Sequence, residues 1–217
     1  MLVLAHRGCH GDVPENTLRA FGAAAARNVD GIETDVRVSL DGLPVLVHDR
    51  VVAGSPVSGL TRAEVERRLG HEVPTLEEAL HAFPDLYWDI EIKTREAVAP
   101  TLRMLEQERR ERRLVTSFRH DAVAVIASRI DVDCGWLIAE RPFSLKALFD
   151  TGSPLERLRT LVCDFEILDA DLVDAARAHG WRIWAYGLKT RDEHVACGAL
   201  GLDGIITDHP ELGLEVR

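Results

Sequence analysis

Short apolar, β-rich runs alternate with helix-like segments from one end of the chain to the other. Eight runs are predicted as strands, at residues 2–5, 31–38, 87–92, 114–117, 135–138, 161–163, 182–186 and 204–207. Helix-like stretches lie between them, at residues 16–28, 75–82, 95–111, 120–128, 144–150, 169–179 and 190–196. This alternation predicts a parallel sheet, because each helix carries the chain back to the end where the next strand begins.

Length narrows the choice between two parallel architectures. A (β/α)8 TIM barrel needs about 200 residues at least, and the chain has 217. With 46% hydrophobic residues it can also fill one substantial core. We therefore predict an α/β protein with a single TIM-barrel domain over residues 1–217, and a doubly wound open sheet is the alternative.

One extended piece interrupts the alternation. Asp41-Gly42 is a strong hairpin signal directly after the second strand, and residues 44–48 form its return arm. The arm is expected to bring His48 back toward Glu33 and Asp35. Residues 51–72 are irregular and then polar-helical, and we predict a short insertion over the barrel mouth.

Charge and composition limit the partners. The chain carries 36 acidic against 26 basic residues, a net charge of -10. Such a surface repels phosphate backbones and anionic lipid, so we expect neither nucleic-acid binding nor stable membrane association. There is no signal-like N-terminus and no long apolar run, and the four cysteines are scattered. These features predict reduced thiols and a cytoplasmic location; the oligomeric state stays open.

Carboxylates gather on one face of two predicted strands. Because side chains alternate with period two, Glu33 and Asp35 share a face of one strand, and Asp89, Glu91 and Lys93 share a face of the other. Buried carboxylates are costly unless they are paired or bound to an ion. Oxygen ligands without thiols or a histidine cluster favour Mg²⁺, Ca²⁺ or Mn²⁺. The pattern predicts one divalent cation on Glu33, Asp35 and Glu91; a buried salt-bridge network is the alternative.

Two histidines and two cationic side chains stand at strand ends. His6 and Arg7 close the first strand, and His48 closes the hairpin return. Imidazoles beside a bound cation offer a general acid and a general base near neutral pH. Arg7 and Lys93 are expected to grip a phosphate, and they provide the local positive charge that an acidic protein needs for an anionic substrate.

Short motifs run in order through the whole chain. They are His6-Arg7-Gly8, Pro14-Glu15-Asn16-Thr17, Ala20-Phe21, Asp30-Gly31-Ile32-Glu33-Thr34-Asp35-Val36, Asp41-Gly42, Val47-His48-Asp49, Pro74-Thr75-Leu76-Glu77-Glu78, Ile90-Glu91-Ile92-Lys93, Ser117-Phe118 and Gly204-Ile205-Ile206-Thr207-Asp208-His209-Pro210. In order and spacing, the set resembles the glycerophosphodiester phosphodiesterase family. The resemblance implies a barrel enzyme that cleaves glycerophosphodiesters to glycerol 3-phosphate and an alcohol.

The resemblance also implies roles for individual residues. It implies that His6 and His48 are the acid–base pair. It implies that Glu33, Asp35 and Glu91 bind one divalent cation, and that Arg7 and Lys93 contact the phosphate. We interpret Asn16 as a helix cap with a possible site contact. Asp208 is expected to end its strand facing the same way as Asp35, without a chemical role of its own.

The chain departs from the family pattern in two places. Residues 50–59 are shorter than the segment usual after the His-Asp pair, and Trp184-Ala185-Tyr186-Gly187 stands where the family has Trp-Thr-Val-Asn. Trp184 either forms an apolar wall of the substrate site or packs in the core. The departures leave open a lysophospholipase D that cleaves lysophospholipids. A barrel without catalysis that serves as a binding module is a third alternative.

Overall fold

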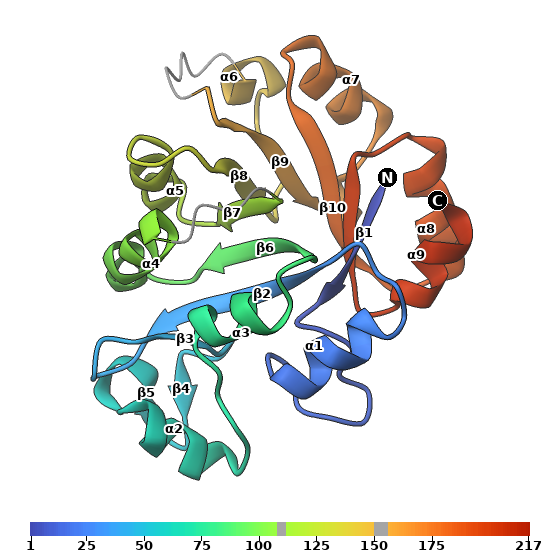
Figure 1. Ribbon diagram of the computed structural model, residues 1–217. Helices are drawn as coiled ribbons and strands as arrows, with labels where there is room; N and C mark the ends of the chain where they lie inside the picture. Colours follow the sequence, from blue (N-terminus) through green and yellow to red (C-terminus); the bar gives the residue numbers. More distant parts are fainter. Residues whose placement is uncertain (108–111, 150–155) are drawn as a thin grey trace.

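The structure is a computed structural model that describes residues 1–107, 112–149 and 156–217 (Figure 1). Eight parallel strands form a closed barrel in the order β1-β11-β10-β9-β8-β7-β6-β2, and β2 pairs with β1 to close it. Their bounds are β1 (Leu2–His6), β2 (Gly31–Val38), β6 (Tyr87–Ile92), β7 (Arg113–Ser117), β8 (Asp133–Ile138), β9 (Leu158–Asp164), β10 (Arg182–Leu188) and β11 (Gly204–Thr207). The predicted barrel is confirmed, and the closing pair excludes an open sheet.

Helices surround the strands, as Figure 1 shows. They are α1 (Leu18–Ala25), α3 (Leu76–Ala82), α4 (Arg95–Gln107), α5 (His120–Ala127), α6 (Leu145–Phe149), α7 (Ala170–Ala178), α8 (Arg191–Ala199) and α9 (Pro210–Val216). The sequence did not predict α9, and the predicted ends of α4 at Glu111 and of α6 at Asp150 lie outside the described residues. In the part of the chain that the structure describes, no helix has the length and hydropathy of a membrane span.

Period-two alternation divides the strand side chains between two cores. One face of each strand packs against the helices in a large apolar cluster that includes Val3, Ile32, Ile90 and Ile205. The opposite face points into the barrel, where a smaller apolar cluster fills the side formed by β7 to β11 and β1; it consists of Leu4, Leu114, Leu137, Val162, Trp184 and Ile206. On β2 and β6 the inward positions are acidic instead, so the barrel interior is polar on one side.

The insertion after β2 is a small unit of its own. β3 (Pro44–Leu46) pairs antiparallel with β2, and β4 (Val51–Val52), β5 (Ser55–Pro56) and α2 (Arg62–Leu69) follow. A separate apolar cluster holds the unit together, formed by Val45, Val47, Val52, Val57, Leu60, Val65 and Val73. Figure 1 shows it beside β3 at the periphery, not across the barrel mouth as predicted, because its apolar side chains turn toward β3.

The four cysteines are free thiols, as the sequence predicted. Cys134, Cys163 and Cys197 are buried, and burial raises the pKa of each thiol to about 12. A thiol with so high a pKa stays protonated and unreactive at neutral pH. These three cysteines therefore serve as small apolar core residues.

The loop after β1 depends on glycine at position 8. Gly8 has φ +82°, and a Cβ there would lie 2.7 Å from the carbonyl carbon of Ala20 on α1. Gly8→Ala is therefore expected to lower the free energy of unfolding by about 1–3 kcal/mol in chemical denaturation. Gly11→Ala is the matched control, since nothing lies within 4 Å of its Cβ position. Equal denaturation midpoints for both variants would contradict the close approach.

Candidate active site

The polar residues singled out from the sequence meet at the carboxyl end of the barrel strands. His6 is the last residue of β1, Glu91 lies one residue before the end of β6, and Asp208 follows β11 directly. In parallel barrels this end carries the active site, because the loops after the strands converge there. Arg7 and Lys93 each follow the last residue of their strand, so they belong to the same rim.

Three carboxylates come together on β2 and β6. Asp35 pairs in register with Glu91, and Glu33 stands one step below on the same inward face. Each of Glu33, Asp35 and Glu91 offers an oxygen, and these oxygens lie within 4.8 Å of one another. All three side chains are almost completely buried. The period-two alternation thus places the three predicted metal ligands at one point.

Burial and mutual repulsion shift the pKa values of the carboxyl groups in this cluster. Burial, and then the negative charges of Asp35 and Glu91, raise the pKa of Glu33 well above its usual value. Burial also raises the pKa of Glu91. One step deeper on β6, burial raises the pKa of Asp89 to about 8, although Thr116 donates a hydrogen bond to it at 2.7 Å. Carboxylates forced together without enough compensating charge favour a bound cation.

Two basic side chains compensate part of the charge. Lys93 Nζ lies 2.8 Å from Glu91 Oε1 and 3.2 Å from Asp35 Oδ1. Arg7 Nε lies 3.0 Å from Asp35 Oδ2, and Arg7 also donates to both oxygens of Glu15 at 3.0 Å. Burial alone would raise the pKa of Asp35, but Lys93 and Arg7 hold it below the usual value. The salt-bridge network considered as an alternative is thus present within the carboxylate cluster.

The donor set fits a hard divalent cation. Lys93 and Arg7 compensate the charge of the three carboxylates only in part, because Arg7 also pairs with Glu15. Glu33 Oε2 accepts a hydrogen bond from the backbone N–H of Arg7 at 3.2 Å. Its other oxygen, Oε1, is buried and has no hydrogen-bond partner among the described residues. A buried carboxylate oxygen in that position, beside two further carboxylates, suits Mg²⁺, Ca²⁺ or Mn²⁺.

Asn16 makes the site contact that the sequence analysis allowed for, but it is not the helix cap. Thr17, not Asn16, caps α1, because its hydroxyl accepts from the Ala20 N–H. The Asn16 amide instead donates to Asp35 Oδ2 at 2.9 Å, while its carbonyl accepts from the Asp35 N–H at 3.3 Å. Asn16 has φ +56° and Arg7 φ +54°, a region that non-glycine residues rarely adopt. Strained backbone of this kind is common at functional sites.

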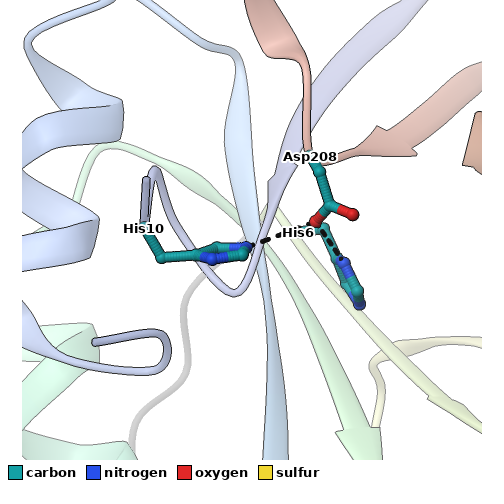
Figure 2. Close-up of side chains that lie close together, drawn as sticks. All are labelled: His6, His10 and Asp208. Carbon is teal, nitrogen blue, oxygen red and sulfur yellow. Dashed lines mark hydrogen bonds and ion pairs between the residues drawn. The ribbon is translucent and has the colours of Figure 1, made fainter. Parts of the chain in front are cut away.

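His6 reaches the cluster from β1. Its Nε2 lies 3.9 Å from Glu33 Oε2, and its Nδ1 lies 2.7 Å from Asp208 Oδ1. His10, in the loop after β1, reaches the same oxygen with Nε2 at 3.3 Å. Figure 2 shows both imidazoles directed at one oxygen of Asp208. The sequence analysis assigned Asp208 no chemical role, and the signal for it was that it follows a strand and faces the same way as Asp35.

His48 reaches the cluster from the hairpin arm. The Val47 N–H donates to the Asp35 carbonyl at 3.1 Å, which brings the arm back to β2 as predicted. Arg37 of β2 donates to the His48 carbonyl from Nε at 2.8 Å and from Nη2 at 2.6 Å, which holds this residue beside β2. Its Nδ1 lies 3.0 Å from the exposed Asp49. The two predicted catalytic histidines therefore approach the carboxylates from different elements.

Trp184 is not placed to form a wall of the substrate site. Only 2% of its surface is exposed, and its ring packs 5.8 Å from the ring of Tyr87, the first residue of β6. It pairs in register with Gly204, the first residue of β11. Trp184 therefore fills the interior near the amino ends of the strands. The same strand carries Gly187 with φ +82° near its carboxyl end, where the pairing with β11 shifts register.

A closed parallel barrel with acidic side chains and imidazoles at the carboxyl ends of its strands defines a barrel enzyme. The chain belongs to the glycerophosphoryl diester phosphodiesterase family, whose sequence profile matches residues 6–212. The resemblance found in the motifs is confirmed. The chain is accordingly a phosphoric diester hydrolase and not a barrel without catalysis.

Individual relatives agree with this assignment. The chain is 29% identical to a probable glycerophosphodiester phosphodiesterase 2 of Mycobacterium tuberculosis, over 97% of this chain and 88% of the relative. It is similar in structure to a Thermotoga maritima glycerophosphodiester phosphodiesterase, with a TM-score of 0.88, 27% identity, and coverage of 100% of this chain and 98% of that one. An Oleispira antarctica phosphodiesterase, at 22% identity, a TM-score of 0.86 and coverage of 100% and 96%, shares the fold.

Proposed function

We propose that the chain hydrolyses glycerophosphodiesters to glycerol 3-phosphate and an alcohol, by acid–base catalysis from two histidines beside a carboxylate-bound divalent cation. The observation that carries the proposal is the buried Glu33 Oε1, which has no hydrogen-bond partner in the described part of the chain and lies in a three-carboxylate cluster that His6 adjoins. The Oleispira antarctica phosphodiesterase is solved in complex with the product sn-glycerol-3-phosphate, which supports a small phosphate ester as the ligand of this fold.

In this proposal Glu33, Asp35 and Glu91 hold the cation, which is Mg²⁺, Ca²⁺ or Mn²⁺. When bound, the cation supplies positive charge to the phosphate oxygens and so stabilises the transition state. Asn16 keeps Asp35 in place, because it donates to one carboxylate oxygen of Asp35 and accepts from its backbone N–H.

Arg7 and Lys93 provide the phosphate contacts. Both lie at the rim beside the carboxylates, with 17% and 13% of their side chains exposed. The contact of Arg7 with the half-exposed Glu15 is a surface ion pair, which contributes little to the free energy of folding. A phosphate offers the arginine fork a stronger bidentate partner, so an incoming substrate can replace Glu15 there.

His6 and His48 carry the proton transfers. One imidazole takes a proton from the attacking oxygen, which belongs to water or to a neighbouring hydroxyl of the substrate glycerol. The other imidazole gives a proton to the departing alkoxide, so that the alcohol leaves neutral. If water attacks, it hydrolyses the phosphorus–oxygen bond to the alcohol directly. If the glycerol hydroxyl attacks, the alcohol leaves first and water then opens the cyclic phosphate.

A product assay on a substrate panel tests this function. Incubation with glycerophosphocholine and other glycerophosphodiesters in the presence of divalent ions is expected to release glycerol 3-phosphate. No release from any member of the panel would contradict the proposal. Product identity matters, because cleavage on the other side of phosphorus would yield a phosphorylated alcohol instead.

The same assay examines the lysophospholipase D alternative. One observation favours it: Phe118, just after β7, is 46% exposed and packs edge-on against Tyr186 of β10 at 6.0 Å, an aromatic pair that an acyl chain can contact. We expect glycerophosphocholine to be cleaved with higher kcat/KM than lysophosphatidylcholine. The reverse order, together with release of lysophosphatidate, would transfer the assignment to the lysophospholipid.

A further inference from the structure

The last barrel strand ends in a carboxylate that two histidines share. Ala5 of β1 pairs in register with Thr207 of β11, so the next residues, His6 and Asp208, emerge side by side. Barrel closure thus joins residues 202 positions apart in the sequence. His10 comes from the loop after β1, and Figure 2 shows it on the other side of Asp208 from His6.

The contacts fix which imidazole nitrogens carry protons. Asp208 Oδ1 lies 2.7 Å from His6 Nδ1 and 3.3 Å from His10 Nε2. Hydrogen bonds from His10 and then His6 hold the pKa of Asp208 well below its usual range. An ionised carboxylate only accepts hydrogen bonds, so His6 must donate from Nδ1 and His10 from Nε2. The Nε2 of His6, which faces Glu33, is then the nitrogen left for substrate chemistry.

We propose that Asp208 is a positioning residue that fixes the ring and tautomer of His6, and that His10 holds Asp208 on His6. The proposal rests on the proposed function, since it gives His6 a proton to move at Nε2. About half of the Asp208 side chain is exposed, at 51%, and a lone carboxylate so exposed would rotate away. The second imidazole restrains it, because one oxygen then satisfies two donors.

The other catalytic histidine lacks this support. Among the described residues, the carboxylate recorded against the His48 imidazole is that of its sequence neighbour Asp49, at 3.0 Å, and 77% of the Asp49 side chain is exposed. No second imidazole is recorded on Asp49 in the described part of the chain. The two histidines therefore differ, and His6 is the one held from behind by a carboxylate of another strand.

Kinetics of Asp208 variants test the proposal. Asp208→Asn is expected to lower kcat by roughly 10–10²-fold with little change in KM, the usual effect of losing a group that orients a functional histidine. Asp208→Glu, which keeps the charge, should recover part of the loss and serves as the second variant if Asp208→Asn folds poorly. His10→Ala should lower kcat by less than Asp208→Asn. In a His6→Ala background, Asp208→Asn should have no further effect.

A matched control lies on the next turn. His209 and Glu211 form a separate exposed pair at 3.5 Å, and Glu211→Gln should leave kcat unchanged. If His6→Ala abolishes activity while Asp208→Asn retains wild-type kcat, the positioning role is overturned and the proposed function stands. If Asp208→Asn also lowers kcat by the same factor in the His6→Ala background, Asp208 acts elsewhere and the proposal is likewise overturned.

A readout independent of turnover completes the test. Proton–nitrogen NMR of ring-labelled protein should show His6 protonated at Nδ1, and Asp208→Ala should convert it to a mixture of tautomers. An unchanged His6 tautomer in that variant would overturn the proposal even if the wild type lacked phosphodiesterase activity. Loss of the Nδ1–H signal on adding a divalent ion would overturn it too, since His6, His10 and Asp208 would then be ligands of the ion.

Discussion

Replacing His6 or His48 with alanine is expected to lower kcat by about 10²–10⁴-fold, the usual size of a general acid or base contribution. Both imidazoles stand beside the carboxylate cluster, and each can move one of the two protons that diester cleavage requires. About a third of each side chain is exposed, at 30% and 37%, so neither belongs to the apolar core. Steady-state turnover of glycerophosphocholine measures the effect, and the denaturation midpoint should stay close to that of the wild type.

A third histidine provides the control for that experiment. His71 lies in the insertion, where its Nδ1 meets the carbonyl of Glu72 at 2.8 Å, away from the carboxylates. His71→Ala should therefore leave kcat unchanged. Near-normal turnover in both His6→Ala and His48→Ala would remove the acid–base assignment, whereas a loss in only one would leave a single proton-transfer residue.

Replacing Glu33 with glutamine is expected to separate stability from activity. The change removes one of three proposed cation ligands, and since a bound cation contributes several kcal/mol to charge stabilisation, kcat/KM should fall by about 10²-fold or more. A carboxyl whose folded-state pKa is raised weakens the folded state above its ordinary pKa. Without divalent ions at neutral pH, Glu33→Gln should therefore unfold at the same or a higher temperature than the wild type.

Thermal unfolding with and without divalent ions measures both effects. Ligand binding stabilises the wild type by mass action, about 2.7 kcal/mol at one hundred times the dissociation constant, and Glu33→Gln should gain less. Asp89→Asn is the matched control, because this buried carboxyl has a pKa of about 8 and its hydrogen bond from Thr116 can be kept by an amide oxygen. An equal gain in wild type and Glu33→Gln would contradict the cation site.

Much of the fold could be predicted because buried parallel strands are read directly from apolar runs. The bounds of β2, β6 and β11 agree with the predicted strands, and each of these strands is followed directly by a polar residue, Ser39, Lys93 or Asp208. Helix α9 was missed, since Pro210–Val216 is short and packs against α8 and β1. The place of the insertion was also wrong, because only its own apolar cluster against β3 decides where it lies.

The carboxylates of the candidate site could be predicted because alternating residues of single strands carry them. Glu33 and Asp35 alternate on β2, and period two is enough to aim both inward. The contact between His6 and Asp208 depends on barrel closure across 202 residues, which no local pattern reports. Trp184 shows a second limit of prediction from sequence. Alternation places its side chain inside the barrel, but its depth along the barrel axis follows from its pairing with Gly204, which the sequence does not reveal.

The dependence of turnover on a divalent ion tests the central claim most directly. Release of glycerol 3-phosphate from glycerophosphocholine should stop when a chelator removes divalent ions, and it should return when Mg²⁺, Ca²⁺ or Mn²⁺ is restored in excess. Recovery with one of these ions is the predicted result, since three buried carboxylate oxygens within 4.8 Å form the proposed binding site. Undiminished release in excess chelator, from protein stripped of divalent ions beforehand, would contradict the account.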